Sequence, residues 1–101
     1  MGETRSLNLR YTPKALAELA DILAYIAERS PAGARNVQAR IRAITTLLTQ
    51  YPLSGQLTSE SGFRKITTSP YPFAIFYEVT DEEVIVIGLR HTARDPASNP
   101  G

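Results

Sequence analysis

The stretch that decides the fold is residues 63–95, FRKITTSPYPFAIFYEVTDEEVIVIGLRHTARD. It contains three runs rich in β-branched and aromatic residues, and turn-forming residues separate them at 69–72 and 80–83. This pattern predicts an antiparallel meander with strands at about 63–68, 72–79 and 83–90. Because residues 84–87 are apolar on both faces, we expect the last strand to be the central one, covered on each side or lying beneath helices.

The alternation of side chains along a strand assigns residues of this stretch to faces of the sheet. In the second run, Tyr77 falls on the same face as residues 73, 75 and 79. In the last run, Arg90 falls on the same face as residues 84, 86 and 88. The pattern leaves open which of these faces is exposed.

A short strand and a helix are expected before this stretch. Residues 7–11 alternate apolar and polar side chains, which is typical of a strand with one buried face. Thr12 followed by Pro13 then predicts a helix start, because the hydroxyl can cap the helix and proline suits its first position. Apolar residues at helical spacing extend this helix to about Glu28.

A second helix follows almost without a loop. Ser30 and Pro31 repeat the cap-and-proline arrangement, and apolar residues at helical spacing continue to about Gln50. Two helices joined so tightly are expected to lie antiparallel. Residues 51–62 are polar and contain glycine and proline, so we expect them to form one long loop.

The element order β-α-α-β-β-β predicts an α+β domain. Each helix has one apolar stripe, so the helical hairpin should pack on one face of a small antiparallel sheet and leave the opposite face open. With 101 residues, the chain has room for one domain, residues 1–101. We expect an ordered core at about 7–95 and tails at 1–5 and 97–101.

The composition excludes several functional classes. The 11 basic and 10 acidic residues give a formal charge of +1, a small excess for a protein whose main task is to grip nucleic acid. With no cysteine and one histidine, a disulfide framework and a closed zinc site are implausible, and we expect no metal and no cofactor. Neither a signal peptide nor a membrane span is apparent, so we expect a soluble, cytoplasmic protein that does not bind membranes.

The basic end of the meander is the candidate site for chemistry. His91 is the only histidine, the residue type that titrates near neutrality, and we expect it within reach of Tyr77 and Arg64. An enzyme built on it would be a metal-free ribonuclease, with His91 as general acid or base and Tyr77 aligning the ribose hydroxyl. The side chains that would stabilise the phosphate are Arg64, Lys65, Arg90 and Arg94.

A structural interpretation of the same residues competes with the ribonuclease. In this structural interpretation, His91 bonds to backbone or solvent while the arginines pair with Glu78 and Asp95. The structural interpretation is favoured because no second acid or base is evident. Aromatic side chains could also stack on bases beside basic groups: Tyr51, Tyr71, Phe73, Phe76 and Tyr77. The small net charge favours ordinary packing for these rings.

Six short motifs occur in a characteristic order over about residues 7–95: YTPKALAEL at 11–19, Ser30-Pro31, Pro52 with Gly55, GFRKI at 62–66, YPFAIFY at 71–77 and VIGLRHTARD at 86–95. In this order and spacing, the chain resembles the ParE branch of the RelE/ParE superfamily of bacterial toxin–antitoxin systems. The resemblance implies a compact toxin that a cognate antitoxin neutralises by wrapping its C-terminal segment around it. For ParE-like members the implied target is DNA gyrase, whereas RelE-like members cut mRNA on the ribosome.

The small net charge favours the ParE-like interpretation, because a nuclease on the ribosome must bind a dense phosphate surface. We therefore expect a gyrase-binding toxin, without direct nucleic-acid contact, in a hetero-oligomer with a ParD-like antitoxin that has an N-terminal ribbon-helix-helix domain. The predicted target-binding residues are Arg64, Lys65, Arg90, His91 and Arg94.

Two further residue sets follow from the resemblance and the helical pattern. In the RelE-like alternative, the catalytic groups would be Arg64, Tyr77, Arg90 and His91. An antitoxin could occupy an apolar groove beside the helices or add a strand to the sheet. The residues predicted to line such a groove are Leu16, Leu23, Tyr25, Val37 and Ile41, for which plain core packing is the favoured alternative.

Overall fold

The computed structural model describes residues 6–59 and 62–94. The expected tails at 1–5 and 97–101, and the proposed pairing partner Asp95, lie outside the described residues. The described secondary-structure elements are, in chain order, β1 (Asn8–Tyr11), α1 (Pro13–Ala27), α2 (Pro31–Gln50), the 3-10 helix η1 (Pro52–Ser54), β2 (Gln56–Leu57), β3 (Phe63–Thr67), β4 (Phe73–Val79), β5 (Glu83–His91) and the 3-10 helix η2 (Thr92–Arg94).

Both α-helices begin at the caps expected from the sequence. The Thr12 hydroxyl accepts a hydrogen bond from the backbone N–H of Ala15 at 3.1 Å, and the Ser30 hydroxyl accepts one from Gly33 at 2.9 Å. In each helix the residue after the cap is a proline. Proline has no N–H, and this costs no hydrogen bond because an N–H at the first helical position has no acceptor within the helix. Within the described part of the chain, no helix is long and apolar enough to cross a membrane.

The sheet has the strand order β1-β5-β4-β3-β2. The strands β3, β4 and β5 pair antiparallel, which confirms the predicted meander. The predicted α+β fold with a helical hairpin on one face of the sheet is confirmed, but β1 pairs with β5 in parallel, so the sheet is mixed and not antiparallel throughout. Alternation within one short strand does not specify the direction of its neighbour.

Two other features of the sheet differ from expectation. The middle strand is β4 and not β5, because β2 extends the sheet on the side of β3. This strand β2 pairs Gln56 with Lys65 and Leu57 with Arg64, inside the stretch that was predicted to be loop. A run of two paired residues is too short to leave an alternating pattern in the sequence.

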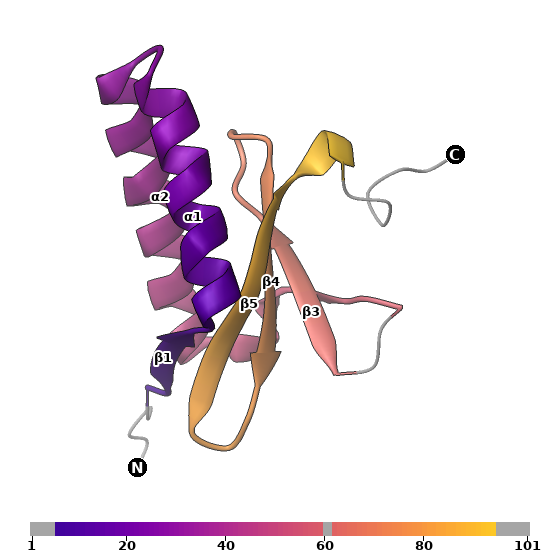
Figure 1. The fold of residues 1–101 in the computed structure, drawn as a ribbon. Helices are drawn as coiled ribbons and strands as arrows, with labels where there is room; N and C mark the ends of the chain where they lie inside the picture. Colours follow the sequence, from indigo (N-terminus) through magenta and orange to yellow (C-terminus); the bar gives the residue numbers. More distant parts are fainter. Residues whose placement is uncertain (1–5, 60–61, 95–101) are drawn as a thin grey trace.

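The α-helices lie side by side on one face of the sheet, and neither covers the opposite face (Figure 1). The core fills the space between the helices and the sheet. Fully burying a valine, leucine or isoleucine side chain contributes about 1.5–3 kcal/mol to the stability of the fold. The main buried side chains are Ala15, Val37, Ile41, Ile44, Leu48, Phe73, Ile75, Tyr77, Val84, Val86 and Leu89.

A β-bulge in β5 changes which residues share a face. The neighbouring β4 residues Phe76 and Tyr77 pair with Gly88 and Val86, so Ile87 is an extra residue in β5. Val86 and Leu89 both belong to the core on the helix side, although three positions separate them. Arg90, paired with Ala74, therefore lies on the opposite face, and the prediction that it shares a face with residues 84 and 86 is wrong.

Candidate functional site

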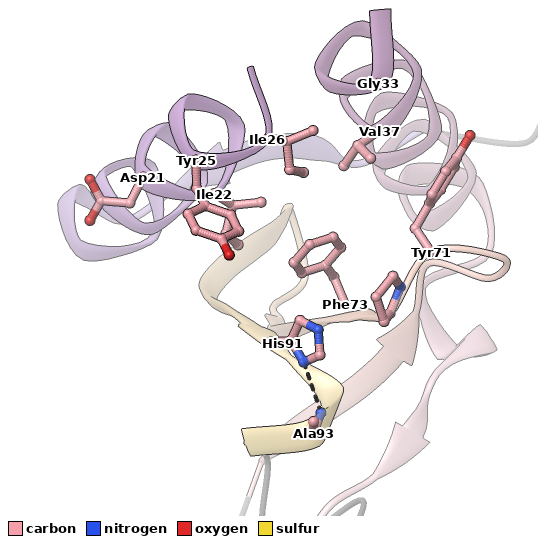
Figure 2. Close-up of a pocket in the computed structure, with 11 residues that line it drawn as sticks. Asp21, Ile22, Tyr25, Ile26, Gly33, Val37, Tyr71, Phe73, His91 and Ala93 are labelled. Carbon is pink, nitrogen blue, oxygen red and sulfur yellow. Dashed lines mark hydrogen bonds between the residues drawn. The ribbon is translucent and has the colours of Figure 1, made fainter. Parts of the chain in front are cut away.

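An apolar groove of about 850 Å³ opens between the tip of the helical hairpin and the ends of β4 and β5. Figure 2 shows side chains from α1 and α2 along one side and the rings of Phe73 and His91 along the other. The lining residues are Asp21, Ile22, Tyr25 and Ile26 from α1, Gly33 and Val37 from α2, and Tyr71, Pro72, Phe73, His91 and Ala93 from the sheet side.

The turn before β4 is held in place as a wall of this groove. The Thr68 side chain is 0% exposed, and its hydroxyl bonds to the backbone oxygens of Tyr71 and Phe73 at 3.0 and 3.2 Å. From α2, the Arg40 guanidinium donates to the backbone oxygen of Ser69 at 2.9 Å. These contacts fix the Tyr71 side of the groove to both the sheet and the second helix.

His91 forms the opposite wall. Its Nδ1 accepts a hydrogen bond from the backbone N–H of Ala93 at 3.1 Å, which requires an unprotonated Nδ1. Its ring packs edge-to-face with Phe73, with centroids 5.5 Å apart. The His91 side chain therefore contacts backbone and an apolar ring. This is the kind of contact that the structural, non-catalytic interpretation predicts for His91.

Tyr77 and Arg64 hold a loop to the sheet. The Tyr77 side chain is 0% exposed; its hydroxyl donates to the backbone oxygen of Pro52 and accepts from the N–H of Gly55, each at 2.8 Å. Arg64 donates to the backbone oxygen of Gly55 at 2.8 Å. Burial raises the pKa of Tyr77, while the Gly55 hydrogen bond and the Arg64 charge oppose this shift. The phenol therefore stays protonated and structural at neutral pH.

Of the predicted nuclease residues, the structure brings Arg64 and Tyr77 together as partners across β3 and β4, and it places His91 and Arg90 elsewhere. His91 pairs with Phe73, four positions before Tyr77 on β4, which corresponds to about 13 Å along the strand. Arg90 lies on the other face of the sheet, where its guanidinium sits 5.6 Å from the centre of the Phe76 ring. Lys65 pairs with Phe76 and shares this face, and Arg94 ends η2.

The residues predicted to bind an antitoxin are spread over three environments. Tyr25 is 57% exposed and lines the groove, whereas Leu16 is 52% exposed on α1 outside it. Leu23 packs partly buried against the core. Val37 and Ile41 are 4% and 2% exposed, and of these two only Val37 also lines the groove.

Sequence reasoning missed several groove residues, notably Asp21, Tyr71 and Phe73. Asp21 had a detectable signal, because it is a charge in an α1 segment otherwise rich in alanine and leucine. Tyr71 belongs to a turn, and a turn pattern does not reveal which helix the turn packs against.

Comparison with known proteins identifies the family. A family model described as the ParE toxin of type II toxin-antitoxin system, parDE, matches residues 9–96. The chain belongs to this family. Within the wider RelE/ParE superfamily, this ParE-family chain is 34% identical to Toxin RelE2 of Caulobacter vibrioides over 84 residues, which cover 83% of this chain and 93% of the relative. It is 32% identical to Putative toxin Y4kP of Sinorhizobium fredii over 84 residues, which cover 82% and 88%.

Solved structures show the same fold for this ParE-family chain. A chain of the chromosomal ParDE toxin–antitoxin system from P. aeruginosa has a TM-score of 0.75 at 23% identity, covering 86% of this chain and 97% of that one. A chain of the RelBE2 toxin–antitoxin complex from Mycobacterium tuberculosis has a TM-score of 0.61 at 17% identity, covering 90% and 97%. The overall fold is thus shared with a chain of a ParDE system and a chain of a RelBE2 complex.

Proposed function

We propose that this ParE-family toxin acts by binding a protein target, DNA gyrase, and that a ParD-like antitoxin anchored in the groove neutralises it. The dispersal of the predicted nuclease residues is the observation that carries the proposal of a binding protein. The ParE family and the +1 net charge support the choice of gyrase, and the proposal includes action in the cytoplasm.

A ribonuclease needs its acid, base and phosphate-binding groups within hydrogen-bond reach of one reacting centre. Here His91 accepts a backbone N–H in the groove, and the Tyr77 hydroxyl is buried against Pro52 and Gly55. Arg90 lies on the opposite face of the sheet. This geometry favours contact with a protein over cleavage of RNA.

The groove supports the antitoxin half of the proposal. It is lined mainly by apolar side chains, it lies between two helices and the end of a sheet, and it presents the exposed ring of Tyr25 at its rim. An amphipathic helix or extended segment fits such a groove by inserting apolar side chains. The ParDE and RelBE2 structures belong to toxin–antitoxin systems, which supports a hetero-oligomer here.

Supercoiling and mRNA-cleavage assays test the target. Purified toxin should inhibit supercoiling by gyrase and leave ribosome-bound mRNA intact, and its expression without antitoxin should arrest growth. His91→Ala should leave gyrase inhibition within a few-fold of the parent, because His91 lines the groove and no general acid is lost. Cleavage of mRNA with untouched gyrase, and a loss of about 10²–10⁴ in cleavage rate for His91→Ala, would establish the nuclease instead.

A pair of tyrosine variants tests the groove. Tyr25→Ala should weaken antitoxin binding about tenfold or more, because exposed aromatic anchors contribute strongly to interfaces. Tyr51→Ala is the matched control: Tyr51 is 59% exposed, at the other end of α2. Calorimetric titration with the antitoxin measures both, and equal affinities of the two variants would exclude the groove as the main contact.

A further inference from the structure

We infer that the toxin contacts its target through the open face of the sheet, by a patch of Phe76, Arg90 and Lys65 that fits an acidic segment of a protein. This inference rests on the proposed function and names the surface that carries it out. The three residues are called the open-face patch below.

The strand register places the patch on the face away from the helices. Lys65 pairs with Phe76 across β3 and β4, and Phe76 pairs with Gly88 across β4 and β5. Neither Lys65 nor Phe76 belongs to the core cluster, which lies on the helix side. Because the β5 neighbour is a glycine, Phe76 has no β5 side chain directly opposite it, and Arg90 extends over its ring.

The chemistry of the patch points to a carboxylate-bearing partner. Arg90 is exposed, with its guanidinium 5.6 Å from the Phe76 ring centre, so the ring orients the cation without neutralising it. A guanidinium held in this way can bind a carboxylate through two parallel hydrogen bonds. Arginine and aromatic residues are also the side chains that contribute most to protein interfaces.

The surrounding charges favour a protein over a nucleic acid. Glu78 lies two positions from Phe76 on the same strand and therefore on the same face, so this face presents few positive charges and matches a single carboxylate better than a row of phosphates. The chain as a whole carries a charge of only +1, whereas gripping single-stranded nucleic acid takes a positively charged groove along several phosphates. An acidic segment with an apolar side chain matches both the ring and the cation.

Charge reversal at two similar arginines tests the inference. Arg90→Glu should reduce the potency of gyrase inhibition at least tenfold and leave antitoxin affinity unchanged. Arg29→Glu is the matched control, because Arg29 is an exposed arginine 4.7 Å from the centre of the Tyr25 ring, on the helical hairpin. It should leave gyrase inhibition at the parent level. Phe76→Leu, which keeps an apolar side chain but removes the ring, should also reduce potency, and circular dichroism checks the folding of each variant.

The outcomes separate the inference from the proposed function. If the parent toxin inhibits gyrase and Arg90→Glu and Phe76→Leu inhibit equally well, the open-face patch is not the contact and the inference fails alone. A parent toxin that leaves gyrase active overturns the proposed function and the inference with it. Binding of single-stranded RNA that Arg90→Glu abolishes would replace the acidic protein partner with a nucleic acid.

Discussion

Tyr77 shows how one side chain can look catalytic in a sequence and be structural in the fold. Its hydroxyl both donates and accepts a hydrogen bond, and the partners are Pro52, the first residue of η1, and Gly55, which joins η1 to β2. At Gly55 a Cβ atom would lie 2.5 Å from this hydroxyl and 2.8 Å from the backbone oxygen of Lys65, so only glycine fits against the phenol. The two residues form one joint between the loop and the sheet.

Tyr77→Phe should destabilise the protein by about 1–3 kcal/mol, because it leaves the buried N–H of Gly55 and an oxygen of Pro52 without their partner. The free energy of unfolding from urea titrations measures this cost. Tyr51→Phe is the control, since this ring is 59% exposed, and it should change stability by less than about 0.5 kcal/mol. Equal stabilities of the two variants would mean that the Tyr77 hydrogen bonds contribute nothing measurable.

Stability should fall in alkaline solution through Tyr11 and Tyr77. Burial is the largest cause that raises the pKa of each phenol above its ordinary value of 10.0, against the lowering effects of Thr45 and Arg42 on Tyr11 and of Gly55 and Arg64 on Tyr77. The unfolded chain therefore releases these protons first, so their contribution is complete below about pH 10 and is lost as pH rises through the folded-state pKa values. Unfolding free energies at pH 8, 9, 10 and 11 should show this decline. The doubly substituted Tyr11→Phe, Tyr77→Phe variant should lose stability less steeply, and a slope equal to the parent's would contradict the assignment.

At the scale of elements, the hairpin depends on its two caps. Thr12→Ala and Ser30→Ala should each cost about 0.5–2 kcal/mol, because each removes the acceptor of a helix N-terminal N–H. For a domain of this size, 1 kcal/mol corresponds to about 4–8 °C in the melting temperature. Ser30→Asp keeps an acceptor oxygen and should stay close to the parent. Thermal melts that fail to separate Ser30→Ala from Ser30→Asp would contradict the capping role.

The elements divide into those that sequence patterns predict and those that depend on tertiary context. Caps, prolines and apolar spacing predicted both helices and the meander, because these signals are local. The pairing of β1 with β5 was not predictable in direction, and β2 is too short to be detected. The prediction of the candidate site was the least accurate, because the extra residue Ile87 shifts the alternation in β5 and places Arg90 on the face opposite to the expected one.

For the whole molecule, the sheet separates the groove from the open-face patch. The groove lies between the sheet and the helices, while the patch lies on the face that neither α-helix covers. An antitoxin confined to the groove would therefore leave the patch accessible. Neutralisation then requires that the antitoxin extend around an edge of the sheet or block the target by its bulk.

We expect a short antitoxin fragment that fills the groove to bind the toxin without restoring supercoiling. The full-length antitoxin should bind and restore it, because its remaining mass reaches the open face. A supercoiling assay with toxin, gyrase and increasing amounts of either antitoxin form measures this difference. Full recovery with the fragment alone would show that the groove and the target surface are coupled or overlap.

The bulge at Ile87 inserts one extra residue into β5 and so changes the face of the sheet to which the following side chains point. Because β5 contains one residue more than the stretch of β4 with which it pairs, Leu89 points into the core and Arg90 points to the open face. Two homologous strands that differ by one residue here can thus present identical surfaces, while two of equal length can present opposite ones. Alignments of such toxins around this position should follow the faces of the sheet and not the residue count.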